Sequence, residues 1–136
     1  TAMETCGHFA PALVAPLAGT VDEFLWDVKD TDPARHKRYV GVDNAQILRN
    51  LRALDQYEVR IVLRCILVRG VNLNTAHARA VRELFASLRH GVRVDLLHYH
   101  PFGSQKGEQL GREGGGRTDW IPTREEVEDF RREAGL

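Results

Sequence analysis

The chain has 136 residues, of which 43% are hydrophobic, and this is enough to form one domain with a sizeable apolar core. Lys plus Arg and Asp plus Glu number 19 each, so no net positive field is available for nucleic acid or an anionic membrane surface. The two cysteines, Cys6 and Cys65, form no disulfide framework and no apolar run reaches membrane-spanning length, so we expect a cytoplasmic protein that binds neither nucleic acid nor membrane.

Short apolar, β-branched runs alternate with amphipathic stretches, which is typical of βαβα organisation. The run IVLRCILV (61–68) is apolar except for Arg64, as expected of a strand covered on both faces in a parallel sheet. The expected elements in chain order are a strand at 1–5, a helix at 11–18, a strand at 23–29, helices at 32–40 and 44–54, a strand at 58–68, a helix at 75–89, a strand at 92–100 and a helix at 123–135.

Apolar residues at helical spacing should place two of these helices on the sheet. The later segment GREGGGR (111–117) predicts a flexible connector, and Thr123 with Glu126 predicts a capped final helix. The two apolar stripes are Ile47, Leu48, Leu51 and Leu54, and Ala80, Val81, Leu84 and Leu88.

Polar residues gather where the predicted strands end. Alternation points Asp27 and Lys29 to one side of their strand, which is compatible with a binding site and with a plain surface ion pair. Arg64 within an apolar strand requires a partner, so it is either a structural ion-pair member or an anion ligand. His98 and His100 lie on one side of the last strand and Tyr99 on the other; the pair makes a weak metal motif, and contact with a ligand is the better interpretation. No role is assigned to the other histidines, which are His8, His36, His77 and His90.

Four motifs in this order resemble one family. METCG, LWDVKDTDPARHKRYVGVDNAQILRNL, RCILVRGVN and LLHYHPFGSQKGEQLG are similar to the C-terminal portion of glycyl-radical enzyme activating enzymes, of which pyruvate formate-lyase activating enzyme is the best-known member. The family belongs to the radical S-adenosylmethionine superfamily. The resemblance implies a partial TIM-type barrel, here an open parallel sheet of about four strands with covering helices.

The resemblance also implies roles for particular residues. Lys29 would contact the methionine carboxylate of S-adenosylmethionine, and Arg64 and His100 would lie near the same cofactor. Asp27 would help to hold a monovalent cation together with Glu4 and Thr5, where Glu4 stands in place of the usual Asp. An acid and a base at one strand end suit the two charges of an amino-acid moiety.

The activity that the resemblance implies is reductive cleavage of S-adenosylmethionine at a [4Fe-4S] cluster. The resulting radical removes a hydrogen from a glycine of a partner enzyme, with electrons from a reductant such as flavodoxin or ferredoxin. The family's cysteine triad is absent, and two distant cysteines cannot replace it. We therefore expect residues 1–136 to be the later part of the barrel domain, to be inactive alone and to self-associate.

Two other interpretations remain open. Asp27, Lys29 and Asp32 spell the Asp-x-Lys-x-x-Asp pattern of orotidine monophosphate decarboxylase barrels, although Asp32 before Pro33 is also a typical helix cap. The non-enzymatic alternative is a shortened barrel that binds a partner protein.

Overall fold

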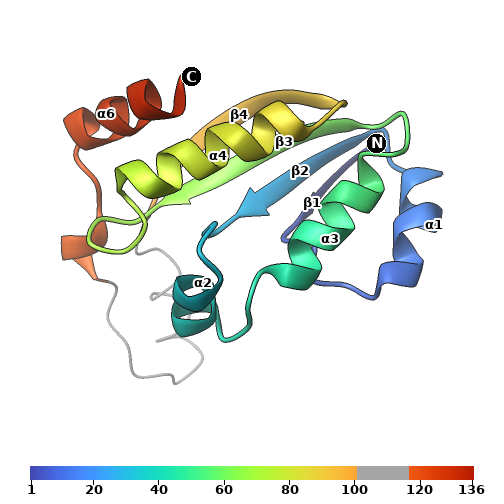
Figure 1. Ribbon diagram of the computed structural model, residues 1–136, viewed down its shortest axis with the longest axis horizontal. Coiled ribbons are helices and arrows are strands. Elements are labelled where there is room, and N and C mark those ends of the chain that lie inside the picture. The colour runs from blue at the N-terminus through green and yellow to red at the C-terminus, as the bar shows by residue number, and fades with distance from the viewer. Residues whose placement is uncertain (101–116) are drawn as a thin grey trace.

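The computed structural model describes residues 1–100 and 117–136 and contains one parallel sheet with its strands in chain order, β1-β2-β3-β4 (Figure 1). This confirms the expected open α/β sheet. Residues 111–116 of the predicted glycine-rich connector lie outside the described residues. The elements are β1 (Ala2–Thr5), η1 (Pro11–Leu13), α1 (Val14–Ala18), β2 (Glu23–Val28), α2 (Pro33–Val40), α3 (Ala45–Leu54), β3 (Arg60–Leu67), α4 (Thr75–Ser87), β4 (Gly91–His98), η2 (Thr118–Trp120) and α6 (Arg124–Ala134).

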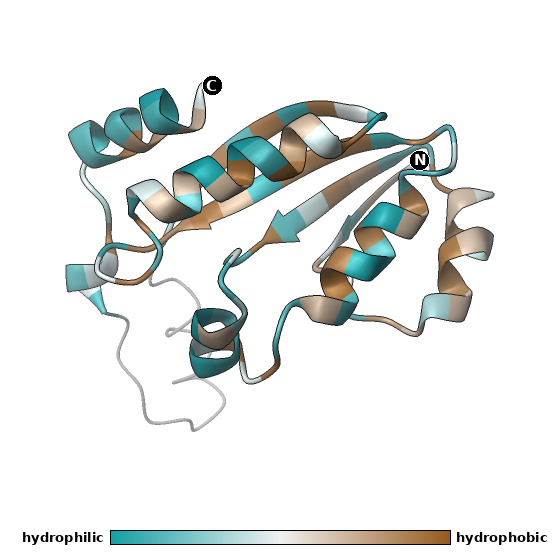
Figure 2. Ribbon diagram, viewed as in Figure 1, coloured by the Kyte–Doolittle hydropathy of each residue, from teal (hydrophilic) through white to brown (hydrophobic). Residues whose placement is uncertain are grey.

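The main core lies between one face of the sheet and the helices. Alternate strand residues such as Trp26 and Leu63 are fully buried there and pack with Leu51 of α3 and Val81 of α4. Figure 2 shows α3 and α4 as amphipathic helices whose apolar residues form stripes. The residues of the two predicted stripes belong to this core or pack against it, except for Ala80; Ala78 of α4 is buried in the core instead.

No helix of the described part of the chain covers the opposite face, so helices cover β3 on one side only (Figure 1). This face carries paired charged residues: Arg60 of β3 pairs with Glu23 of β2, and Arg93 pairs with Asp95 along β4. Val62 lies between them and is nevertheless fully buried. Arg60 and Arg64 flank Val62 on the same face of β3 and Arg93 is opposite it in the register, and long charged side chains can cover apolar surface.

Local caps fix where two helices begin. The side chain of Asp32 accepts a hydrogen bond from the backbone N–H of Arg35 at 2.6 Å at the start of α2. Thr123 and Glu126 form the predicted capping box at the start of α6. The helix α6 packs mainly on α4 and places Phe130 in the core.

Candidate functional site

Four charged side chains meet on the helix-free face of the sheet. Lys29 Nζ lies 3.1 Å from Asp27 Oδ2, as strand alternation predicts for residues two apart. Arg64 is directly across from Asp27 in the strand register and contacts Asp27 Oδ1 through Nε at 2.8 Å and Nη2 at 2.7 Å. Its Nη1 also lies 2.9 Å from Glu4 Oε1. The structure thus brings together four of the predicted site residues from three strands.

The charged side chains of this cluster differ in how much they are exposed to solvent. The side chains of Asp27 and Arg64 are 18% and 17% exposed, whereas that of Lys29 is 38% exposed. Burial lowers the pKa of the Arg64 guanidinium, but its hydrogen bonds to Glu4 and Asp27 outweigh this effect and raise the pKa above its ordinary value. Arg64 therefore stays charged and neutralises much of Asp27, which leaves the Lys29 ammonium able to meet another anion.

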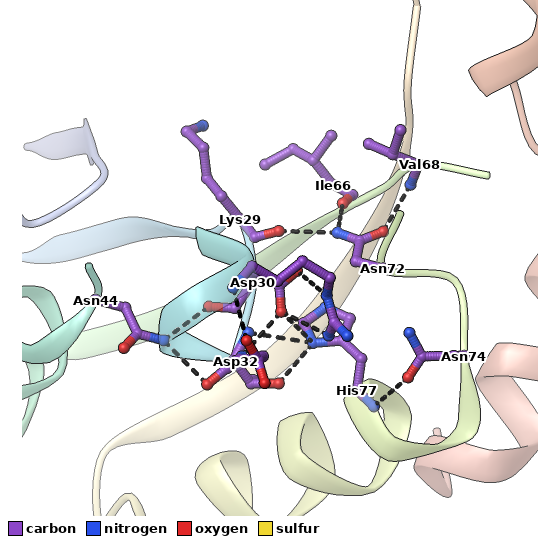
Figure 3. A network of polar contacts seen from close by, with 11 residues as sticks. Lys29, Asp30, Asp32, Asn44, Ile66, Val68, Asn72, Asn74 and His77 are labelled. Atoms are coloured by element: carbon purple, nitrogen blue, oxygen red, sulfur yellow. Dashed lines mark hydrogen bonds and ion pairs between the residues drawn. The ribbon is translucent and has the colours of Figure 1, made fainter. Parts of the chain in front are cut away.

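Asn72 holds the backbone from which Lys29 projects. Its Nδ2 donates to the carbonyl oxygens of Lys29 and Ile66, both at 2.8 Å, and its Oδ1 accepts from the N–H of Val68 at 2.8 Å. Asn72 is 1% exposed. One side chain thus joins the ends of β2 and β3, while the side chain of Lys29 points away from this joint (Figure 3).

A second polar network fixes the loop after Lys29. The Asp30 carboxylate accepts two bonds from Arg35, at 2.6 and 2.8 Å, in the bidentate arrangement that favours charge-assisted pairing. Asn44 donates to the carbonyl oxygens of Asp30 and Thr31 (Figure 3). His77 of α4 contacts the Thr31 hydroxyl through Nδ1 at 2.7 Å. The loop is consequently anchored to α2, α3 and α4.

A mainly apolar pocket of about 240 Å³ opens next to Lys29. Ile66 and Tyr99 line it from the strand ends, and Trp120 of η2 lines it from the far end of the chain. Trp120 makes edge contacts with Tyr99 and Tyr39, with ring centroids 5.6 and 6.0 Å apart. An ammonium group beside aromatic and aliphatic surface suits a ligand with one anionic end and one apolar portion.

His98 and His100 lie on the same side of the chain, as predicted, with their ring centroids 6.4 Å apart. Tyr99 between them turns to Trp120 and the pocket. The lining of the pocket therefore includes Tyr99 and not His100, and the contact of His100 with a cofactor stays a prediction.

Several residues of the site escaped sequence reasoning. Asn72 and Asn44 follow no spacing rule, because each acts by bonding backbone atoms of other loops. Trp120 is far from Lys29 in sequence and reaches the pocket only through the fold. His77, to which no role was assigned, is fully buried, and the signal available for it was its place near the apolar stripe of α4.

Known proteins that are similar to this chain in sequence include activating enzymes. Choline trimethylamine-lyase activating enzyme of Oleidesulfovibrio alaskensis is 40% identical over 83% of this chain and 37% of its own length. Isethionate sulfite-lyase activating enzyme of Nitratidesulfovibrio vulgaris is 38% identical over the same shares. No family model matches the chain. The chain is a homologue of the glycyl-radical enzyme activating enzymes.

Two solved structures have a similar fold. A domain of pyruvate-formate lyase-activating enzyme from Bacteroides vulgatus superposes with a TM-score of 0.78 at 23% identity, over 98% of this chain and 74% of that one. A radical SAM methyltransferase from Sphaerobacter thermophilus superposes with a TM-score of 0.64 at 18% identity, over 98% of this chain and 37% of that one. This activating-enzyme homologue thus has the fold of radical SAM proteins, and it spans little more than a third of the length of the first two curated relatives.

The orotidine monophosphate decarboxylase interpretation is not supported for this activating-enzyme homologue. The third residue of the Asp-x-Lys-x-x-Asp pattern, Asp32, caps α2. The relatives of the chain are activating enzymes. Among the described residues of the chain, no helix is both long enough and apolar enough to cross a bilayer.

The residues of this activating-enzyme homologue fit one group that the family implies and not another. Lys29 and the neighbouring pocket fit the amino-acid end of S-adenosylmethionine. The two cysteines do not fit a [4Fe-4S] cluster: Cys65 is buried on the helix-covered face, and burial raises the pKa of its thiol to about 12. Residues 1–100 and 117–136 also contain no group of three or more His, Cys, Asp or Glu side chains arranged to hold a metal ion.

Proposed function

We propose that this chain forms the part of a glycyl-radical enzyme activating enzyme that holds the amino-acid end of S-adenosylmethionine, with Lys29 contacting the methionine carboxylate. The observation that carries the proposal is the shared carboxylate of Asp27, which bonds both Arg64 and Lys29. Because Arg64 satisfies much of the charge of Asp27, a second carboxylate can pair with the half-exposed Lys29 ammonium.

Each neighbouring residue has a part in this arrangement. Asp27 orients Lys29, and Arg64 holds the Asp27 carboxylate in place near the ligand. Ile66 and Tyr99 offer apolar surface to the rest of the ligand. His100 is proposed as a further contact, on the resemblance of its strand to that of the family. These residues bind and orient the cofactor and exclude water from it.

When bound at a reduced [4Fe-4S] cluster, S-adenosylmethionine supplies the 5′-deoxyadenosyl radical with which this family activates its partners. We propose a glycyl-radical enzyme as the partner, flavodoxin or ferredoxin as the reductant and the cytoplasm as the compartment. The curated relatives act on different lyases and a dehydratase, so the proposal names the partner only by this class.

Calorimetric titration of S-adenosylmethionine into Lys29→Ala tests the assignment. Loss of one charge-assisted contact should weaken binding about 10- to 150-fold, which corresponds to about 1.5–3 kcal/mol. Lys37→Ala, an exposed lysine of α2, is the matched control and should bind as the unmodified chain does. The affinity for 5′-methylthioadenosine, which lacks the carboxylate, should not depend on Lys29. Equal S-adenosylmethionine affinity in both lysine variants would refute the role of Lys29.

We further propose that the 136-residue chain does not build the cluster by itself. Two cysteines, one of them buried, cannot supply the thiolate set of a [4Fe-4S] centre. Reconstitution with iron and sulfide under reducing conditions should therefore leave no stable cluster absorbance. A stoichiometric cluster in the monomer would contradict this proposal.

A further inference from the structure

Arg64 bridges carboxylates from two other strands. Asp27 is its direct neighbour on β2, but Glu4 lies on β1, two strands away, where adjacent strands are about 4.8 Å apart. The guanidinium spans this gap, with Nη1 2.9 Å from Glu4 Oε1 and Nη2 3.1 Å from Glu4 Oε2. Its other contacts, from Nε and Nη2, go to Asp27 Oδ1. Both carboxylates are therefore paired with one fixed positive charge.

The same two carboxylates were predicted to hold a monovalent cation together with Thr5. The Thr5 hydroxyl accepts a bond from the N–H of Gly7 at 2.9 Å. Thr5 also pairs with Trp26 in the strand register, so alternation directs its side chain to the helix-covered face, away from Glu4. The three side chains do not converge on one point, and thus they do not fit a cation site.

The charge balance leads to the same conclusion. Glu4 and Asp27 carry two negative charges, and Arg64 and Lys29 carry two positive ones. A metal cation between the carboxylates would add a third positive charge beside the guanidinium. The further carboxylate opposite Arg64 in the register, Asp95 of β4, is already paired with Arg93.

We propose that the guanidinium of Arg64 takes the place of the monovalent cation in this protein and holds Glu4 and Asp27 in position beside Lys29. The inference goes beyond the proposed function, because it concerns the internal charges of the site and requires no bound cofactor. In this proposal a residue of the chain, Arg64, pairs with Glu4 and Asp27, so the folded site does not depend on Na⁺ or K⁺.

Thermal unfolding of the 136-residue chain in chloride salts of matched ionic strength tests this proposal. The unfolding midpoint should be the same in Na⁺, K⁺ or tetramethylammonium, since no site selects a small cation. Arg64→Met keeps the aliphatic stem but leaves two carboxylates unpaired. Its midpoint should rise by about 3–6 °C in Na⁺ or K⁺ relative to tetramethylammonium, when the salt is well above the dissociation constant.

Arg93→Met is the matched control. It removes a guanidinium from the same face, where Arg93 pairs with Asp95, but it leaves the Arg64 bridge intact and should show no cation preference. Equilibrium dialysis of thallium(I) against the unmodified chain gives a second measurement that does not require any variant to fold. Absence of stoichiometric binding supports the proposal. One thallium ion per chain, displaced by K⁺, or a K⁺-specific rise in the midpoint of the unmodified chain would overturn it.

Discussion

His77 is a buried histidine whose surroundings oppose a positive charge. It has no exposed surface, its ring lies against Phe130, and Nε2 has no hydrogen-bond partner among the described residues. The N–H of Thr31 donates to Nδ1 at 3.3 Å, which places the proton of the neutral ring on Nε2. Burial lowers the pKa of His77 to about 4; the negative charge of Asp30 opposes this shift and the positive charge of Arg35 adds to it.

This lowered pKa predicts that acid destabilises the fold. The unfolded histidine has a pKa near 6.5, so between pH 6.5 and about 4 the unfolded chain binds a proton that the folded chain does not. The free energy of unfolding should therefore fall as the pH falls through this range, by about 3 kcal/mol from this group. Urea titrations at several pH values measure this slope.

His77→Gln should flatten the pH dependence between pH 6.5 and 4, because the titrating group is gone. His8→Gln changes an exposed histidine and should keep the slope of the unmodified chain. If His77→Gln retains that slope as well, the acid sensitivity belongs to other groups, and the assignment to His77 is wrong.

Residue-level predictions succeeded where they followed from strand alternation. The shared side of Asp27 and Lys29 needs only the period of an extended chain, and the structure confirms it. The partner of Arg64 could not be chosen from the sequence, since pairing requires the strand order and register. The burial of His77 likewise depends on α6 packing over α4.

At the scale of secondary-structure elements, Asn72 acts as the joint between β2 and β3. Asn72→Ala would leave two carbonyl oxygens and one N–H without their buried partner. We expect a loss of about 2–4 kcal/mol in the free energy of unfolding, because unsatisfied buried polar groups are costly. Chemical denaturation monitored by circular dichroism measures the loss.

Asn74→Ala provides a nearby control of the same type. Asn74 caps α4 by accepting a bond from the N–H of His77 at 3.0 Å, and removal of a cap costs about 1 kcal/mol. Asn72→Ala should therefore lower the free energy of unfolding more than Asn74→Ala does. An Asn72→Ala variant no less stable than Asn74→Ala would show that the joint contributes only as a cap does.

The order and type of the elements could be predicted from the sequence because each has a local signal, such as the apolar stripe of α3 or the capping box of α6. What covers each face of β3 could not be predicted in this way. An apolar strand with one arginine suggested cover on both faces, and Val62 is indeed buried, but on the face that carries charged residues and no helix of the described part of the chain. Local periodicity does not distinguish a strand face covered by a helix from one flanked by long charged side chains.

At the scale of the whole molecule, residues 1–100 and 117–136 leave the sheet with two open edges and with one face that no helix covers. In the described part of the chain β1 pairs only with β2, and β4 only with β3. The helix-free face carries paired charges, whereas β4 exposes the apolar side chains of Val92 and Leu97, at 39% and 36%. Association through the face would have to bury those charges, so an edge is the favoured route for self-association.

We therefore predict that the chain self-associates through a strand edge. Sedimentation velocity from about 5 to 500 µM should show a concentration-dependent shift that persists in about 0.5 M salt, since backbone pairing is screened far less than ion pairs. A lysine placed on the edge that associates should reduce the shift. Comparison of Ala2→Lys on β1 with Leu97→Lys on β4 therefore shows which edge is responsible. A strictly monomeric chain at the highest concentration, without apolar surface detectable by dye binding, would show that the open edges are not sites of association.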